Sequence, residues 1–87
     1  MKECFIEKYI QKLTINDINN FSLKNNIILN ENEKRLIYNY IKKDWKIIIY
    51  GNPISIFNEL KRNIKIEEYN KIEKLYYIYK NKYKNLL

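Results

Sequence analysis

The four residues Tyr50-Gly51-Asn52-Pro53 divide the sequence into two parts, because they hold its only glycine and its only proline. Glycine suits the left-handed conformation just past a helix end, where a Cβ atom would clash. Asparagine can cap a following helix, and proline fits the first helical position, where its missing N–H costs nothing. We therefore predict that one helix ends here, that Gly51 has a positive φ, and that the next helix begins at Pro53.

The residues just before this corner, Trp45 to Tyr50, include three consecutive isoleucines, which would also suit a β-strand. A lone strand would have no partner elsewhere in the sequence, so we predict a helix instead. Trp45 lies about a turn and a half before the corner, and we expect it to be buried there.

Apolar residues recur with helical spacing along the rest of the chain. Thr14 fits the N-cap of a helix, with Asp17 near the positive helix end, and Asn30 and Glu33 have the spacing of a capping box. The helices predicted in this way cover residues 2–13, 15–24, 31–50, 53–64 and 66–85. The second of them should bury Ile18, Phe21 and Leu23.

These patterns predict one all-α domain over residues 1–87, a compact bundle of about five helices in which the third and fifth are longest. The helical faces that should meet in its core contain residues from all five helices. They are Phe5, Ile10, Ile18, Leu36, Ile37, Tyr40, Ile41, Trp45, Phe57, Leu60, Ile72, Tyr76 and Tyr79.

The last predicted helix carries apolar residues at alternating spacings of three and four, which is a heptad seam. The seam consists of Tyr69, Ile72, Tyr76, Tyr79, Tyr83 and Leu86. One interpretation is a homodimer held by a coiled coil of this helix. We favour a helix packed over the other four, because a seam of under three heptads rarely holds alone.

The net charge of +7 would ordinarily indicate an acidic partner. However, alanine, valine and histidine are absent, lysine outnumbers arginine fifteen to two, and the abundant Ile, Lys, Asn and Tyr all have AT-rich codons. A site selected for nucleic acid tends to use arginine, whose planar fork binds phosphate in a bidentate way. We therefore attribute the basicity to an AT-rich genome.

Few side chains of this sequence can perform chemistry. Without histidine and with Cys4 as the single cysteine, the chain lacks the commonest general base and cannot build a zinc site. One glycine excludes a phosphate-cradling loop. The adjacent carboxylates Glu31 with Glu33 and Glu67 with Glu68 fit first turns of helices, where they oppose the helix dipole favourably. We predict no enzymatic activity, no cofactor and no metal.

The sequence also predicts a cytoplasmic location. A single cysteine excludes an internal disulfide and suits a reducing compartment. No stretch approaches the roughly 18 apolar residues of a membrane span, and Glu3 and Glu7 argue against a signal peptide.

Nucleic-acid binding is the alternative function, because the last helix interleaves lysines with tyrosines on which bases could stack. The contact residues would be Lys71, Lys74, Tyr77, Lys80, Lys82 and Lys84. Most tyrosines of this helix share one stripe, however, and are expected in the core. A helix-turn-helix over residues 15–43 is a second form, but Glu31 and Glu33 would repel phosphate at its recognition helix. We predict only weak, non-specific binding of polyanions at low salt.

From about Leu13 to Leu86 the chain resembles short helical proteins of low-GC Gram-positive bacteria that form a domain of unknown function. The resemblance rests on Leu13-Thr14, Asn26-Ile27-Ile28-Leu29, Tyr40-Ile41 leading to Trp45, the Tyr50-Gly51-Asn52-Pro53 corner, and Phe57 with Leu60. It implies a small all-α cytoplasmic protein and brings no activity, ligand or site residue.

We therefore expect a small non-enzymatic adaptor that binds another protein, with a nucleic-acid-binding module as the alternative. The position of the charges and of the apolar residues distinguishes the two. Lysines gathered on one face would favour nucleic acid, whereas an exposed apolar or tyrosine groove would favour a protein partner.

Overall fold

The computed structural model describes residues 2–84, and within them the chain forms five α-helices and no strand. They are α1 (Lys2–Lys12), α2 (Ile15–Lys24), α3 (Glu31–Tyr50), α4 (Ile54–Asn63) and α5 (Ile66–Tyr83). The predicted all-α bundle is confirmed, and α3 and α5 are the longest helices, with 20 and 18 residues. Two predictions for the last helix, its end at Asn85 and the seam residue Leu86, fall outside the described residues.

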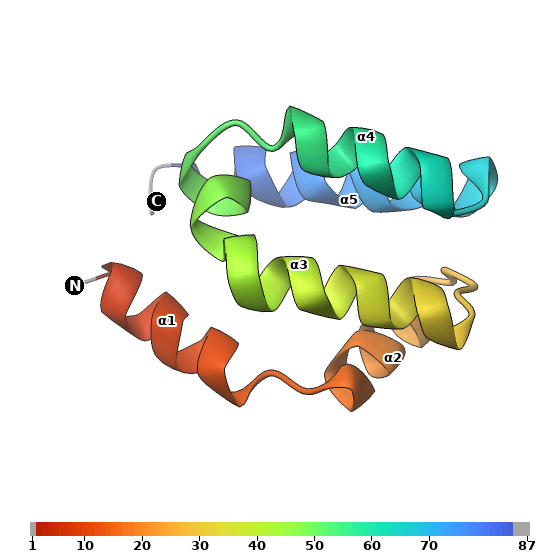
Figure 1. Cartoon of the computed structure of the whole chain (residues 1–87). Coiled ribbons are helices and arrows are strands. Elements are labelled where there is room, and N and C mark those ends of the chain that lie inside the picture. Colours follow the sequence, from red (N-terminus) through yellow and green to blue (C-terminus); the bar gives the residue numbers. More distant parts are fainter. Residues whose placement is uncertain (1, 85–87) are drawn as a thin grey trace.

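Helix α3 crosses the middle of the molecule, with α4 and α5 on one side of it and α1 and α2 on the other (Figure 1). α1, α2 and α4 each pack against α3, whereas α5 packs against α4. The centre of the core consists of Ile56, Leu60, Ile64 and Tyr69 from α4, α5 and the turn between them. The bundle is therefore two helix pairs joined through one central helix.

Both predicted helix starts at Thr14 and Asn30 are confirmed. The Thr14 hydroxyl accepts the Asp17 N–H at 3.2 Å, and the Asp17 carboxylate accepts the Thr14 N–H at 2.9 Å. Asn30 and Glu33 exchange the same two bonds, each at 2.8 Å. Each capping box satisfies two N–H groups that the helix itself leaves unpaired, and such a cap typically contributes about 1 kcal/mol.

The left-handed residue lies at the end of α2, where Asn26 has a φ of 57°. The Asn26 N–H donates to the Leu23 carbonyl at 3.3 Å, and the Ile27 N–H donates to the Ser22 carbonyl at 2.8 Å. This pair of bonds is the Schellman motif, which asparagine tolerates better than most residues because its short polar side chain is stable at positive φ. The motif reverses the chain direction so that the Ile27 side chain is buried in the core.

The corner at Gly51 ends α3 as predicted, but the positive φ predicted there is wrong. Gly51 has a φ of −106° and a ψ of −152°, and its N–H donates to the Ile47 carbonyl at 3.0 Å. The glycine is needed for space, because a Cβ atom would lie 3.1 Å from the Cα and carbonyl oxygen of Ile47. Pro53 precedes the first helical position instead of occupying it, and the Asn52 side chain accepts the Ile54 N–H at 3.2 Å.

The segment from Trp45 to Tyr50 is helical, so the strand alternative is wrong. Trp45 is 8% exposed, which confirms its predicted burial. Just before it, Asp44 takes non-helical angles of φ −117° and ψ 23° and kinks α3. The last turns of α3 bend at this kink toward α4 (Figure 1). The Tyr76 hydroxyl donates to the Ile48 carbonyl at 2.9 Å, which ties α5 to the end of α3.

Most of the predicted core is buried or half-buried, but two members are not. Phe5 is 76% exposed and Tyr79 is 43% exposed, and Phe21 and Leu23, also expected inside, are exposed as well. Within the described residues, no large side chain has less than 2% of its surface exposed. The reason is the arrangement of the helices, since no other element of residues 2–84 covers the open faces of α1 and α5. The core therefore remains open on one side.

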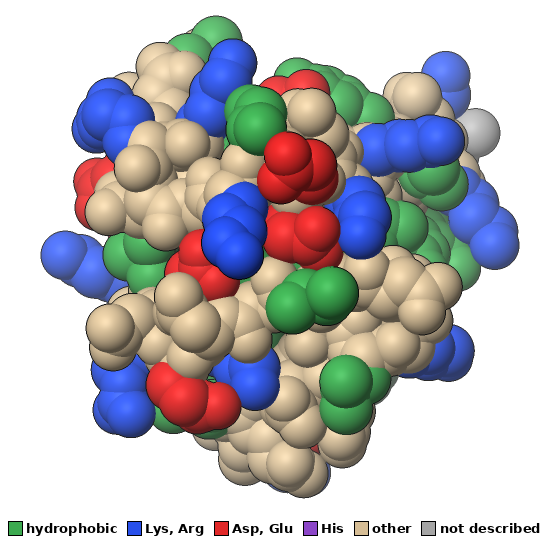
Figure 2. Space-filling model, turned by 90° about the vertical axis from the view of Figure 1, so that its right-hand side faces the viewer, with side chains coloured by type: hydrophobic (Ala, Val, Ile, Leu, Met, Phe, Trp, Pro, Cys, Tyr) green, Lys and Arg blue, Asp and Glu red, His purple; other side chains and the backbone are tan. Residues whose placement is uncertain are grey.

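One end of the molecule, where α4 turns into α5, has a mixed surface (Figure 2). Acidic and basic side chains alternate there, and the apolar side chains form small separate patches. In the part of the chain that the structure describes, no helix is long and apolar enough to cross a membrane.

Candidate functional site: an apolar groove between two helix pairs

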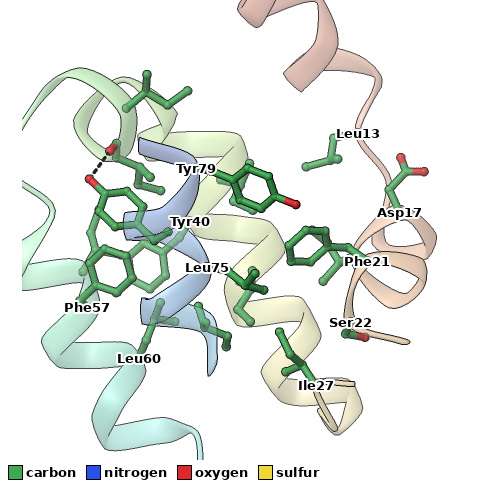
Figure 3. A pocket seen from close by; sticks show the side chains of 18 of the residues that line it. Leu13, Asp17, Phe21, Ser22, Ile27, Tyr40, Phe57, Leu60, Leu75 and Tyr79 are labelled. Carbon is green, nitrogen blue, oxygen red and sulfur yellow. Dashed lines mark hydrogen bonds between the residues drawn. The ribbon is translucent and has the colours of Figure 1, made fainter. Parts of the chain in front are cut away.

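An apolar groove of about 420 Å³ lies between α1–α2 on one side and α5 on the other. We call it the groove throughout. In Figure 3, Leu13 and Phe21 approach it from α1–α2, Leu75 and Tyr79 from α5, and the ribbon of α3 lies between them. Its remaining lining is apolar almost throughout and includes Tyr9, Ile18, Ile27, Ile37, Ile41, Ile48, Phe57, Leu60 and Ile72.

The order of the helices explains why this groove exists. α5 packs on α4, and neither α1 nor α2 is among the helices packed closely on it in the described part of the chain. The apolar stripe of α5 is wider than its contact with α4, because Leu75 lies beside the heptad seam to which Tyr79 belongs. The Leu75 and Tyr79 side chains therefore line the groove, and neither α1 nor α2 packs closely on this side of α5 in the described part of the chain.

Aromatic side chains form the rim of the groove. Tyr9, Phe21 and Tyr79 line it and are nevertheless exposed. Phe5 lies four residues before Tyr9, which places it on the same face of α1, and it is also exposed. Exposed aromatic side chains around an apolar groove can serve as an interaction surface.

The non-aromatic polar residues that line the groove are hydrogen-bonded within the chain, and they are Asp17, Ser22 and Lys80. Asp17 belongs to the capping box of α2, and the Ser22 hydroxyl donates to the Asn19 carbonyl at 2.8 Å. The Lys80 ammonium donates to the Tyr76 hydroxyl at 3.1 Å, and its Nζ lies 5.4 Å from the centre of the Tyr76 ring. The groove therefore offers contact area and shape, and few groups that could act on a substrate.

The titratable groups of the core act as structural hydrogen-bonding partners. Burial, together with the 2.6 Å hydrogen bond to Glu73, raises the pKa of Tyr69 to about 12. The neighbouring Glu59 carboxylate, and then burial, raise the pKa of Tyr40 to about 12. Both phenols stay protonated at neutral pH, and neither is activated as a nucleophile.

No three His, Cys, Asp or Glu side chains of residues 4–84 come together in a way that could hold a metal ion. Cys4 is exposed on α1. The two carboxylate pairs lie in the first turns of α3 and α5, as predicted.

The residues predicted to contact nucleic acid lie on two sides of α5. One side carries Lys74, Tyr77, Lys80 and Lys84, which follow one another at spacings of three, three and four, and the other side carries Lys71 and Lys82. Lys71 donates to the Asn26 carbonyl at 2.8 Å and pairs with Glu68 at 3.2 Å. Lys80 is bonded to Tyr76, as described above. Nine residues separate these two lysines, which puts them on opposite sides of the helix, since nine residues make two and a half turns. The Lys82 ammonium lies 5.5 Å from the Tyr83 ring centre, and Lys74, Tyr77 and Lys84 are exposed.

The sequence predictions did not include the groove, because the apolar residues lining its walls were assigned to a filled core or left unassigned. One signal could have indicated it. The apolar stripe of the last helix contains Leu75 and Ile78 in addition to the heptad seam, which is more apolar surface than one neighbouring helix can cover.

Fold and site together define a small all-α domain with an open apolar groove. The sequence matches no protein-family model and no curated protein, and the structure matches no solved structure. The resemblance to short helical proteins of Gram-positive bacteria therefore stays a prediction, and the function is argued from the groove.

Proposed function

We propose that this protein is a small non-enzymatic interaction module that binds an amphipathic helix of a partner protein in the groove. The observation that supports this proposal most is the length and apolar lining of the groove. Along its α5 wall, Ile72, Leu75 and Tyr79 line it over about 10 Å at 1.5 Å per residue. A helix that binds in a groove uses apolar anchors at positions i, i+3 or i+4, and i+7, which span the same length.

The open core supports the same proposal. An 87-residue chain buries only about 60–65% of its unfolded surface, so it gains much from any further apolar burial. A partner helix would cover Phe21 and Tyr79, which the chain itself leaves exposed. Aromatic residues near the centre of an interface typically carry most of its binding energy.

Two alternative ligands are less well supported. The volume of the groove lies within the range of small-molecule sites, but such sites present free polar groups that orient the ligand. Here Asp17, Ser22 and Lys80 are already bonded within the chain. Nucleic acid would require basic and aromatic groups that are free on one face. Lys74, Tyr77, Lys80 and Lys84 share one side of α5, but Lys80 is bonded to Tyr76, and Lys71 and Lys82 lie on the other side.

Selection from a displayed library of helical peptides tests the proposal. We expect enriched peptides to carry apolar residues at i, i+3 or i+4, and i+7, and to bind the purified protein with a measurable Kd in fluorescence anisotropy. Tyr79→Ser and Phe21→Ser should each weaken that binding about tenfold or more, as expected for hot-spot aromatics.

The matched controls are Ile78→Ser and Leu23→Ser. Ile78 follows the same helix as Tyr79 and is 47% exposed, and Leu23 lies beside Phe21 and is 67% exposed, but neither lines the groove. Both controls should leave the Kd within about twofold. Equal losses for groove and control variants, or a library that yields no helical pattern, would contradict the proposal.

A further inference from the structure

We infer that the helix bound in the groove is acidic beside its apolar stripe, so that the partner is an anionic amphipathic helix. This inference rests on the proposed function and specifies the partner of the same site. It follows from the charges that surround the groove on both walls.

On the α5 wall, every charged residue of the second half of the helix is a lysine. Residues 74–84 contain Lys74, Lys80, Lys82 and Lys84 and no aspartate or glutamate. Lys80 itself lines the groove. Lys82 follows Leu75 by seven residues and Tyr79 by three, so it lies on the same side of α5 as these two groove residues. This wall therefore presents positive charge next to its apolar stripe.

The α1 wall repeats this arrangement. Phe5, Tyr9 and Lys12 follow one another at spacings of four and three, so the lysine continues the exposed aromatic face. Glu7 lies midway between Phe5 and Tyr9 in the sequence, which turns it to another side of α1. Within the described side chains, each wall therefore carries a lysine next to an exposed aromatic residue, Lys82 next to Tyr79 on α5 and Lys12 next to Tyr9 on α1.

Asp17 is the one carboxylate among the residues that line the groove, and its Oδ2 accepts the Thr14 N–H at 2.9 Å at the positive end of the α2 dipole, which stabilises its charge. Against this one negative charge stand Lys80, Lys82 and Lys12, so the surroundings of the groove carry an excess of positive charge. Complementary charge around an apolar contact steers the encounter and rejects partners of the wrong sign.

The charge also argues against two other occupants. A second copy of this chain carries the same +7 and would bring two lysine-rich α5 segments together. A flat anionic bilayer could reach the lysines at the rim, but the apolar lining lies below the rim, between the walls. A helix with flanking carboxylates can contact the lining and the lysines at once.

The test uses three synthetic helical peptides that share one apolar stripe at positions i, i+3, i+4, i+7 and i+11. The positions beside the stripe are all Glu, all Gln or all Lys. Fluorescence anisotropy measures their Kd at low salt and at roughly 150 mM salt. We expect the Glu peptide to bind about tenfold more tightly than the Gln peptide and the Lys peptide to bind worst, with the differences shrinking at higher salt.

A charge reversal assigns the effect to the groove. Lys82→Glu should reduce the preference for the Glu peptide over the Lys peptide about tenfold. Lys43→Glu makes the same change of net charge at an exposed position of α3 that does not line the groove, and it should reduce the preference about twofold or less.

The possible failures are distinct. If all three peptides bind equally and Tyr79→Ser weakens each of them, the inference is overturned and the proposed function stands. If none binds at about 1 mM, both are overturned. Tighter binding of single-stranded DNA, of vesicles containing phosphatidylserine, or of a second copy in sedimentation equilibrium than of the Glu peptide would also overturn the inference.

Discussion

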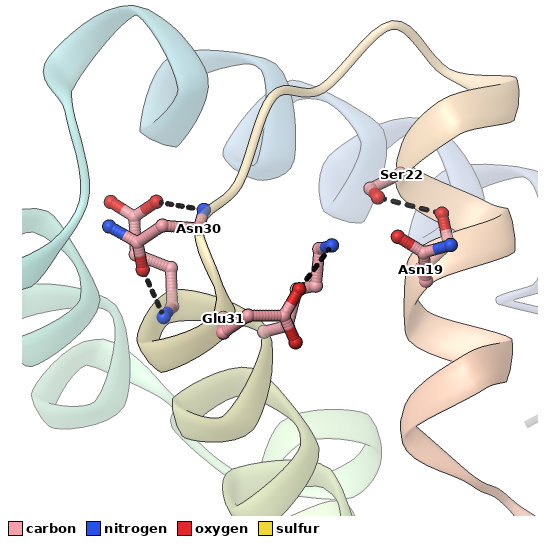
Figure 4. A network of polar contacts seen from close by, with 6 residues as sticks. Asn19, Ser22, Asn30 and Glu31 are labelled. Carbon is pink, nitrogen blue, oxygen red and sulfur yellow. Dashed lines mark hydrogen bonds and ion pairs between the residues drawn. The ribbon is translucent and has the colours of Figure 1, made fainter.

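The two ends of α5 lie in opposite environments. Where α5 begins, at the end of the molecule that also holds the α2–α3 turn, polar groups are paired across the chain. The Glu68 carboxylate accepts the Ile28 N–H at 2.6 Å, and Lys71 donates to the Asn26 carbonyl at 2.8 Å. The Asn30 capping box of Figure 4 lies in the same turn. We call this region the polar end.

The second half of α5, in contrast, borders the groove. Tyr79 is exposed there, and one hydrogen bond, from Tyr76 to Ile48, ties this half to α3. Across the groove, α1 is held to α3 by Lys42, whose ammonium donates to the Ile10 and Gln11 carbonyls at 2.6 and 2.8 Å. Apolar surface is left uncovered where polar contacts are few.

This difference separates what holds the fold from what is available to a partner. Directional hydrogen bonds at the polar end fix where α5 starts relative to the α2–α3 turn, and each buried group there is satisfied. At the groove, Tyr76 is bonded to Ile48, but the exposed Phe21 and Tyr79 side chains lie in no such network among the described residues, so they can change neighbours without leaving a buried polar group unpaired. We therefore expect mutations at the polar end to affect stability and mutations at the groove to affect binding.

The largest expected effect is the loss of stability in Ile64→Ala. Ile64 is 5% exposed and lies in the turn between α4 and α5 at the polar end, outside the groove. Removing its buried methylene groups should lower the free energy of unfolding by about 2–4 kcal/mol in a urea titration. Phe5→Ala, at an exposed site, should change it by about 0.5 kcal/mol or less. Similar losses in both variants would show that the open face is part of the core.

The sequence predicted the polar end better than the groove, because its signals are local. Thr14 with Asp17, and Asn30 with Glu33, lie three residues apart, and a capping box depends on little beyond that spacing. Five helices and their order follow from hydrophobic periodicity in the same way. The contact of Glu68 with Ile28 joins residues 40 positions apart, and no pattern in the sequence reveals it.

The groove could not be predicted, because periodicity shows which face of a helix is apolar but not whether a neighbour covers it. Phe5 and Tyr79 satisfy the same spacing rules as the buried Ile10 and Tyr69. Their exposure depends on α5 packing against α4 instead of α2, which is a property of the whole arrangement. The error at Gly51 has a similar origin, since the need for glycine comes from close backbone approach to Ile47.

A smaller effect is expected at the left-handed Asn26. Asn26→Ala should destabilise the protein by about 1 kcal/mol, because alanine resists positive φ, whereas Asn26→Gly should be neutral or stabilising by up to about 1 kcal/mol. The side chain of Asn26 is exposed, so little packing is lost in either variant. Thermal melts of the two variants measure the difference. If alanine and glycine gave the same melting temperature, the left-handed turn would not form in solution.

The smallest expected effect is a change in how stability depends on pH, through Glu68. The hydrogen bond from the Ile28 N–H lowers the pKa of this carboxyl, and Lys71 lowers it further, while burial opposes them. A carboxyl with a lowered folded pKa contributes stability above its unfolded pKa of about 4.5, and this contribution is lost as the pH falls through the folded pKa. Glu68→Gln should therefore be less stable than the wild type near neutral pH, and the difference in stability should narrow as the pH falls from about 6 to about 3.

Melting temperatures of the wild type and of Glu68→Gln across that pH range measure this gap in stability. Glu67→Gln, at the exposed neighbour in the same turn, is the control and should cause a smaller loss near neutral pH. A gap for Glu68→Gln that stays constant with pH would mean that the charged carboxylate does not hold α5 to the α2–α3 turn.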